Sequence, residues 1–427
     1  MFNQNGLSLN QAPPISVVFR FFFSGSIFGI LTGIFILFFQ NTIFDPNSMG
    51  ALTVTHTLTL GVMLSFMFAS LFQMLPVIAG VSLNSPVKKA NILQYPFIAG
   101  VILLLFAFNF FYSWLFILAS ILLGGSIMYI AITMLINLLK IENHSTSSQG
   151  MLYSLASLAF VIILALYLSG NMAGVISLEH YNHIKASHYS FGLFGWISLL
   201  IVSISFQVIE MFYVTPSYPK IVSRYIPLSI IIILSISTIV GFYTQAFTTV
   251  SNILLALILS FYALLTLRRL TQKKRPLTDA TVWFWRAGLS SLLLSMIFMI
   301  TSEFINIQSI NILSYILFAS FAISIVFAMF YKIIPFLTWF HLNSQGYYAA
   351  PMMHEVIHPK TAMKHLYIHL ATIVSFILAI FISKFIFLAG TLTIVSFSWM
   401  TYQVIHAHIL YKRTQESGEK FEMNISN

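Results

Sequence analysis

Residues 51–80 read ALTVTHTLTLGVMLSFMFASLFQMLPVIAG and contain no aspartate, glutamate, lysine or arginine. A helix needs about 20 consecutive apolar residues to cross the hydrocarbon core of a bilayer. The whole chain has this character, because 59% of its 427 residues are hydrophobic and 7% are charged. A water-soluble domain carries about 25% charged residues. We therefore expect a helical membrane protein surrounded by the lipid bilayer.

Eleven further apolar runs make twelve predicted spans, so the predicted fold class is all-α, with residues 1–427 forming a single polytopic transmembrane domain and no separate soluble domain. The spans are expected near residues 15–40, 51–80, 93–112, 114–140, 150–176, 187–213, 223–244, 247–269, 280–302, 309–339, 364–383 and 386–411. No small-residue cleavage site follows the first span, which is expected to be an uncleaved anchor and not a signal peptide.

The distribution of lysine and arginine predicts the orientation. With the N-terminus in the cytoplasm, 15 of the 20 basic residues fall in cytoplasmic loops or the C-terminal tail. Such a bias marks the cytoplasmic side of bacterial membrane proteins. We therefore expect both termini in the cytoplasm and a multi-pass protein of the bacterial inner membrane. The same bias accounts for the net charge of +10 without a nucleic-acid partner.

An internal repeat links the second, sixth and tenth spans. Gly61 is followed after twelve residues by Gln73, and Gly195 by Gln207, while Ser320 begins the same offset in the tenth span. The spacing indicates three tandem four-helix units, although apolar helices also match by chance. The units cover residues 15–140, 150–269 and 280–411 approximately.

Several strings resemble a known family. They are HTLTLG at residues 56–61, LFQMLPV at 71–77, GLFGW at 192–196 after His188, and MFYKIIPFLTWFH at 329–341. They resemble sequences of the heme-copper oxidase subunit I superfamily. Within it, they are similar to a 12-span bacterial group related to the NnrS-type heme- and copper-containing membrane proteins. The resemblance implies three pseudo-symmetric four-helix arcs and heme b near the outer face. It also implies a role in respiratory redox or nitrogen-oxide stress chemistry, beside other respiratory-chain or oxidase-assembly proteins.

Two departures from that family argue against a terminal oxidase. In the family, the seventh span supplies two copper ligands and the tenth supplies two heme ligands. Here the seventh span contains no histidine, and the tenth has Tyr315 where the repeat would place His56. Its single histidine is His341, at the inner end. We therefore expect no standard oxygen-reducing centre and leave open whether the protein is an enzyme.

Two histidines near the outer face are the candidate heme ligands. His56 begins the second span and His188 begins the sixth, at similar depth. Neutral imidazole binds iron, copper or zinc, so facing rings would ligate a heme iron axially or share a metal. The alternative is that each ring only hydrogen-bonds a backbone carbonyl or a lipid headgroup, because an unsatisfied polar group in hydrocarbon is costly.

A second group of histidines lies near the inner face: His341, His365, His369, His406 and His408. His365 and His369 are four residues apart and share a helix face. Convergence of three to five of these rings would form a site for copper or another transition metal, or a proton relay. The alternative is a set of separate interfacial histidines.

Three charged residues fall well inside the predicted spans: Glu210, Arg286 and Lys332. Because a charge in lipid is costly, each should face the bundle interior, and Glu210 is expected to pair with Lys332 or Arg286. If these residues instead line a proton or ion path, the protein is a cofactor-free secondary permease. An accessory or assembly subunit of a respiratory complex is a third possibility.

The sulfur-containing residues exclude several chemistries. The chain has no cysteine, which rules out disulfides, iron–sulfur ligation and catalytic thiols. Its 18 methionines form no cluster outside the predicted spans, and we expect them to fill the core.

No phosphate-binding glycine loop occurs, so nothing in the sequence favours ATP-driven transport.

Overall fold

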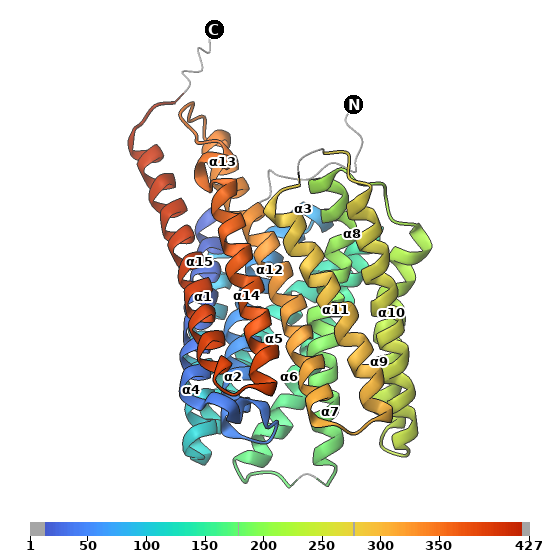
Figure 1. Cartoon of the computed structure of the whole chain (residues 1–427). Coiled ribbons are helices and arrows are strands. Elements are labelled where there is room, and N and C mark those ends of the chain that lie inside the picture. Colours follow the sequence, from blue (N-terminus) through green and yellow to red (C-terminus); the bar gives the residue numbers. More distant parts are fainter. Residues whose placement is uncertain (1–12, 178, 276–277, 421–427) are drawn as a thin grey trace.

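The structure, a computed structural model, describes residues 13–177, 179–275 and 278–420. Within these residues, twelve helical segments are long and apolar enough to cross a bilayer, which confirms the predicted count and the all-α class. The chain is therefore a multi-pass membrane protein whose outer surface contacts lipid (Figure 1).

The first eight spans comprise α1 (Ile15–Phe39) with η2 (Gln40–Phe44), α2 (Met49–His56) with η3 (Thr57–Leu64) and α3 (Ser65–Ala79), α4 (Pro86–Phe110), α5 (Ser113–Leu139), α6 (Thr146–Met172), α7 (Tyr181–Ser190) with η4 (Phe191–Ser198) and α8 (Leu199–Tyr213), α9 (Lys220–Val240) and α10 (Gln245–Thr271). The last four are α11 (Ala280–Phe304), α12 (Gln308–Ser344), α14 (Pro359–Phe381) and α15 (Phe385–Glu416), with the short α13 (Met353–Val356) before α14.

Polar side chains and prolines at the helix starts explain where several spans begin. Ser48, Ser145 and Asp279 each accept a backbone N–H of the first turn of α2, α6 and α11. These bonds satisfy donors that a helix N-terminus leaves unpaired. Pro86 and Pro359 occupy the first position of α4 and α14, where the missing N–H costs nothing.

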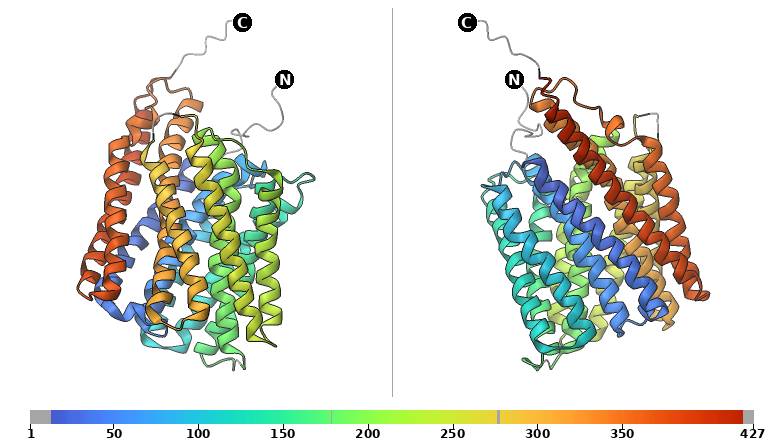
Figure 2. Two further views of the ribbon diagram at one scale, coloured as in Figure 1. Left: turned by 45° about the vertical axis from the view of Figure 1, so that its right-hand side comes forward. Right: turned by 90° about the vertical axis from the view of Figure 1, so that its left-hand side faces the viewer.

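The twelve spans close into a ring in which the three units follow one another. The last helix of each unit packs on the first helix of the next: α5 on α6, α10 on α11 and α15 on α1. Figure 2 shows α15 lying along α1, so the two ends of the bundle meet. This arrangement agrees with three successive four-helix arcs.

The second span of each unit lies on the inside of the ring. In the most apolar windows of the described helices, 78%, 72% and 61% of residues are buried for the spans that end in α3, α8 and α12. The corresponding share is at most 56% for the other nine. The repeat pattern was found in these three spans, and they are the ones that meet in the bundle interior.

Two π-helical segments interrupt the second and sixth spans at matching places. The segments η3 and η4 each have eight residues and start 134 positions apart, which is also the spacing of Gly61 and Gly195. A Cβ atom on Gly61 would lie 2.6 Å from Phe28 of α1, and one on Gly195 would lie 2.9 Å from Ser157 of α6. Each glycine therefore lets the second helix of its unit approach the first helix closely.

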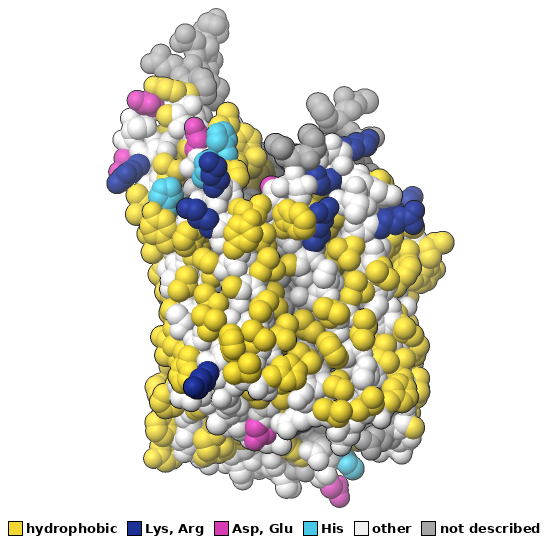
Figure 3. All heavy atoms as spheres, in the orientation of Figure 1, with side chains coloured by type: hydrophobic (Ala, Val, Ile, Leu, Met, Phe, Trp, Pro, Cys, Tyr) yellow, Lys and Arg dark blue, Asp and Glu magenta, His cyan; other side chains and the backbone are white. Residues whose placement is uncertain are grey.

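The two ends of the bundle differ in charge. Lysine and arginine side chains gather over the end where α3, α8 and α12 finish (Figure 3). Helix α1 begins and α15 ends at this same end. The positive-inside rule assigns this end to the cytoplasm, and we call it the inner end. The orientation itself stays a prediction.

Candidate functional site

His56 and His188 occupy corresponding places at the outer end of the bundle. Each is the eighth residue of its span, counted from Met49 and from Tyr181. His56 directly precedes η3, and His188 lies three residues before η4. Because π-helical segments inside α-helices frequently occur at functional sites, the two segments support His56 and His188 as functional residues.

The hydrogen bonds of the two rings leave one nitrogen of each available. His56 Nδ1 lies 2.8 Å from Leu52 O, and His188 Nδ1 lies 3.3 Å from Val161 O. A carbonyl oxygen only accepts hydrogen bonds, so a neutral ring must carry its proton on Nδ1 and keep its lone pair on Nε2. In the described part of the chain, neither Nε2 atom has a hydrogen-bond partner.

This arrangement suits metal ligation. A ligating histidine almost always donates its second ring N–H to a carbonyl, carboxylate or water, which fixes the tautomer and orients the ring. Lys185 of α7 donates to Asn47, which lies just before α2, at 3.1 Å, so the helices that carry His188 and His56 start side by side. Phe108 packs 4.9 Å from the His56 ring, centroid to centroid, and provides an apolar wall. The two Nε2 lone pairs therefore suit heme iron. The hydrogen bonds to backbone carbonyls that the alternative interpretation expects are also present, on Nδ1 of each ring.

The five inner histidines lie on three helices, α12, α14 and α15, and their role as metal ligands stays a prediction. Within the described residues there is no group of three or more metal-ligating side chains. His406 and His408 are exposed on α15, and His406 stacks on Tyr402. His341 packs on its neighbour Phe340 at the end of α12. The last two helices extend further than predicted, so these rings are spread over different depths and faces.

His365 and His369 instead form a buried polar network within the bundle. Helix α14 begins at Pro359, five residues before the predicted boundary, which places both rings inside the span. His365 Nδ1 lies 2.9 Å from Tyr331 Oη, and His365 Nε2 lies 2.6 Å from Ser396 Oγ. His369 Nε2 lies 2.7 Å from Ser324 Oγ. With both nitrogens of His365 satisfied, this ring is not placed as a metal ligand.

The intramembrane lysine pairs with a residue that the sequence pattern did not single out. Lys332 Nζ donates to Asp279 Oδ2 at 2.6 Å, so the predicted pairing of Lys332 with Glu210 is wrong. Glu210 Oε1 accepts the backbone N–H of Tyr218 and stabilises the turn between α8 and α9. Arg286 lies over the ring of Trp283, at 4.8 Å, so the predicted pairing with Glu210 is replaced by a cation–π contact.

Asp279 organises a polar cluster at the inner end. Its Oδ1 atom accepts from Thr281 Oγ1 at 2.6 Å, and Tyr213 Oη donates to the same Thr281 oxygen at 2.9 Å. Burial raises the pKa of Asp279, but the positive charge and hydrogen bond of Lys332 outweigh it and hold the pKa below its ordinary value. Asp279 was missed because it lies just after a basic loop, where an aspartate reads as a solvated residue.

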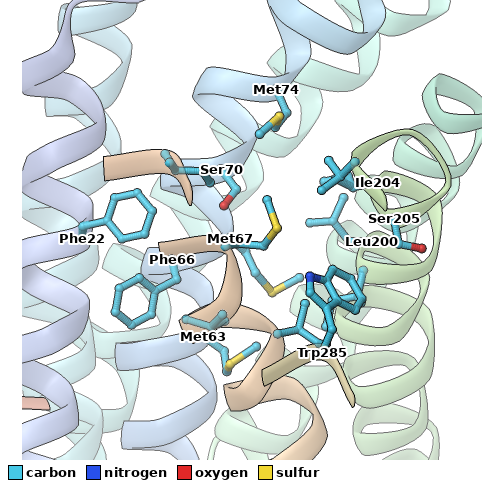
Figure 4. A pocket seen from close by; sticks show the side chains of 16 residues that line it. Phe22, Met63, Phe66, Met67, Ser70, Met74, Leu200, Ile204, Ser205 and Trp285 are labelled. Atoms are coloured by element: carbon cyan, nitrogen blue, oxygen red, sulfur yellow. The ribbon is translucent and has the colours of Figure 1, made fainter. Parts of the chain in front are cut away.

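A small cavity lies between the second helices of the three units. It has a volume of about 60 Å³ and is lined mainly by α3, α8 and α12, with Phe22 of α1 and Trp285 of α11 (Figure 4). Its walls are apolar except for the hydroxyls of Ser70 and Ser205 and the indole N–H of Trp285. No sequence pattern indicates this cavity, because its lining residues come from five helices.

Comparisons with known proteins add no family assignment: no protein-family model matches the chain, and no curated protein matches it either. The resemblance to oxidase subunit I therefore stays a prediction from the quoted motifs.

Proposed function

We propose that this protein belongs to the bacterial cytoplasmic membrane and holds heme b near the outer end of the bundle through His56 and His188. It acts in respiratory redox or nitrogen-oxide stress chemistry, next to other respiratory-chain proteins, and lacks a standard oxygen-reducing centre. The observation that carries the proposal is the pair of Nε2 atoms to which the described residues offer no hydrogen-bond partner, on two rings that are each oriented through Nδ1.

The chain's own residues have distinct parts in this proposal. His56 and His188 would hold the iron through Nε2, and the carbonyls of Leu52 and Val161 hold the two imidazoles in the tautomer that leaves Nε2 unprotonated. Phe108 shields the His56 ring from water. When bound, heme b supplies one-electron transfer between the ferric and ferrous states.

The test is the amount of heme that the purified protein retains. Protein from heme-replete cells is extracted in a mild detergent, and its heme is converted to the pyridine complex and quantified. We expect a b-type spectrum and about one heme per chain. A colourless preparation without iron would refute the proposal.

A second candidate function is a cofactor-free secondary permease. The central cavity lies where the three repeat units meet, as binding sites do in many transporters built from repeats. Ile333 lines the cavity, and its neighbour Lys332 forms the ion pair with Asp279 at the inner end. A permease with this structure would therefore use the ion pair of Asp279 and Lys332. It would not use the set of Glu210, Arg286 and Lys332 that the sequence predicted. Absence of heme together with solute flux into proteoliposomes that Asp279→Asn abolishes would favour this candidate.

A further inference from the structure

Four methionines line the central cavity. Met63, Met67 and Met74 come from the second span, and Met329 comes from α12. The first three are separated by four and seven residues, so they lie along one face of the helix. Figure 4 shows the side chains of these three residues extending from that helix into the cavity. Four of the 18 methionines, which were expected to fill the core, therefore line one cavity.

We propose that this cavity binds monovalent copper, Cu(I), through the thioether sulfurs of Met63, Met67 and Met329. Soft thioether and thiolate ligands select Cu(I), whereas carboxylates, carbonyls and water suit Mg²⁺, Ca²⁺ and Mn²⁺. Since the chain contains no cysteine, methionine is its only soft ligand. The site uses methionine sulfurs and is separate from the inner histidines predicted from the sequence.

The remaining lining residues argue for a soft ion of low charge. None of the side chains that line the cavity carries a formal charge, so a hard cation would find no anionic oxygen there. Ser205 Oγ is already occupied, because it donates to Val202 O and accepts from Tyr262 Oη. A single positive charge loses less on desolvation than a double charge.

The aromatic residues of the cavity support the same choice. Phe22, Phe66 and Trp285 lie among its walls. Aromatic ring faces attract cations, and tryptophan does so most strongly. Methionine side chains are flexible and polarizable, so the sulfurs can adjust around an ion without moving the helices. The inference depends on neither the heme proposal nor the permease proposal.

Competition for Cu(I) tests this site directly. The purified protein is mixed anaerobically, under reducing conditions, with a chromophoric Cu(I) chelator, and the loss of chelator absorbance gives the bound copper. We expect about one Cu(I) per chain, and X-ray absorption should show sulfur as the main ligand. The Met67→Leu/Met329→Leu double variant should bind at least tenfold more weakly, because leucine keeps the volume and removes the sulfur.

The matched control is the Met134→Leu/Met151→Leu double variant, which changes two fully buried methionines outside the cavity. It should bind Cu(I) as the parent protein does. Both variants are checked for folding by size-exclusion profile and thermal unfolding. If the parent protein retains no Cu(I), if the bound ion is coordinated by nitrogen, or if the cavity variant binds as the parent does, the methionines serve packing alone and the proposal fails.

Discussion

Lys332 of α12 donates to Asp279, the N-cap residue of α11, at a distance of 2.6 Å. One carboxylate therefore caps a helix through Oδ1 and neutralises an intramembrane lysine through Oδ2. The pair lies at the boundary of the bundle, with side chains 17% exposed for Lys332 and 38% exposed for Asp279. Solvent screening at this depth limits the coupling between the two charges.

A double-mutant cycle at this pair should give a coupling of up to about 1 kcal/mol, as expected for a partly exposed ion pair. Asp279→Asn keeps a capping oxygen but removes the charge, and Lys332→Met removes the other partner. Asp279→Ala should cost about 1 kcal/mol more than Asp279→Asn, because it also removes the cap. Thermal unfolding in detergent measures each variant.

The control for that cycle is Glu210, the partner that sequence reasoning favoured. Glu210→Gln and Lys332→Met should have additive effects, because Glu210 contacts the Tyr218 backbone and not Lys332. Coupling of Lys332 to Glu210, with none to Asp279, would contradict the pairing.

The buried histidine of α14 should matter for stability. His365→Phe leaves the hydroxyls of Tyr331 and Ser396 without their imidazole partner, at a cost of about 1–3 kcal/mol for each unsatisfied group. His406→Phe, at an exposed position of α15, should change stability by no more than about 0.5 kcal/mol. Equal thermal stabilities for the two variants would show that the network does not form.

The π-helical glycines offer a test of helix packing. Gly61→Ala places a Cβ atom 2.6 Å from the Phe28 ring, so overpacking should cost about 1–3 kcal/mol. Gly192, in the corresponding segment η4, has open space around its Cβ position and serves as the control. Gly192→Ala should be neutral or slightly stabilising, since alanine favours helix. Unfolding temperatures that fall equally in both variants would argue against the close approach of η3 to α1.

The orientation can be tested with single cysteines, because the chain has none of its own. An impermeant thiol reagent added to intact cells should leave cysteines at Lys88, Thr271 and Ser417 unlabelled. The same reagent should label a cysteine at the exposed Glu179, on the opposite side. Labelling of the first three positions from outside would reverse the assignment of the inner end.

Sequence reasoning located the spans well because hydropathy is a property of each segment alone. The twelve runs follow from apolar length, and the Gly61 and Gly195 pattern marks two of the three spans that the structure buries most, although their burial was not predicted. It failed where an outcome depends on contacts between distant segments. In the sequence, Asp279 has the character of a loop residue, and its role becomes evident only where α11 and α12 pack side by side. His365 was placed near the interface, and its burial follows from the start of α14 at Pro359.

The candidate ligands were found from depth, whereas their chemistry needed the folded chain. His56 and His188 stand out because each is a polar ring near the start of an apolar span. Which nitrogen is available follows only from the carbonyls of Leu52 and Val161, and the second of these lies on a different helix. The four methionines of the cavity could not be recognised as a group from the sequence either, because Met329 is far from the others along the chain.

The reduced-minus-oxidised visible spectrum of the purified protein tests heme ligation by His56 and His188. We expect a Soret band and a sharp α-band of a low-spin heme in the parent protein and in His406→Ala. In His56→Ala and in His188→Ala these bands should be lost or shifted toward the high-spin form, because one of the two proposed iron ligands would be missing. Identical low-spin spectra in all four proteins, or no heme bands in the parent protein, would contradict heme ligation by His56 and His188.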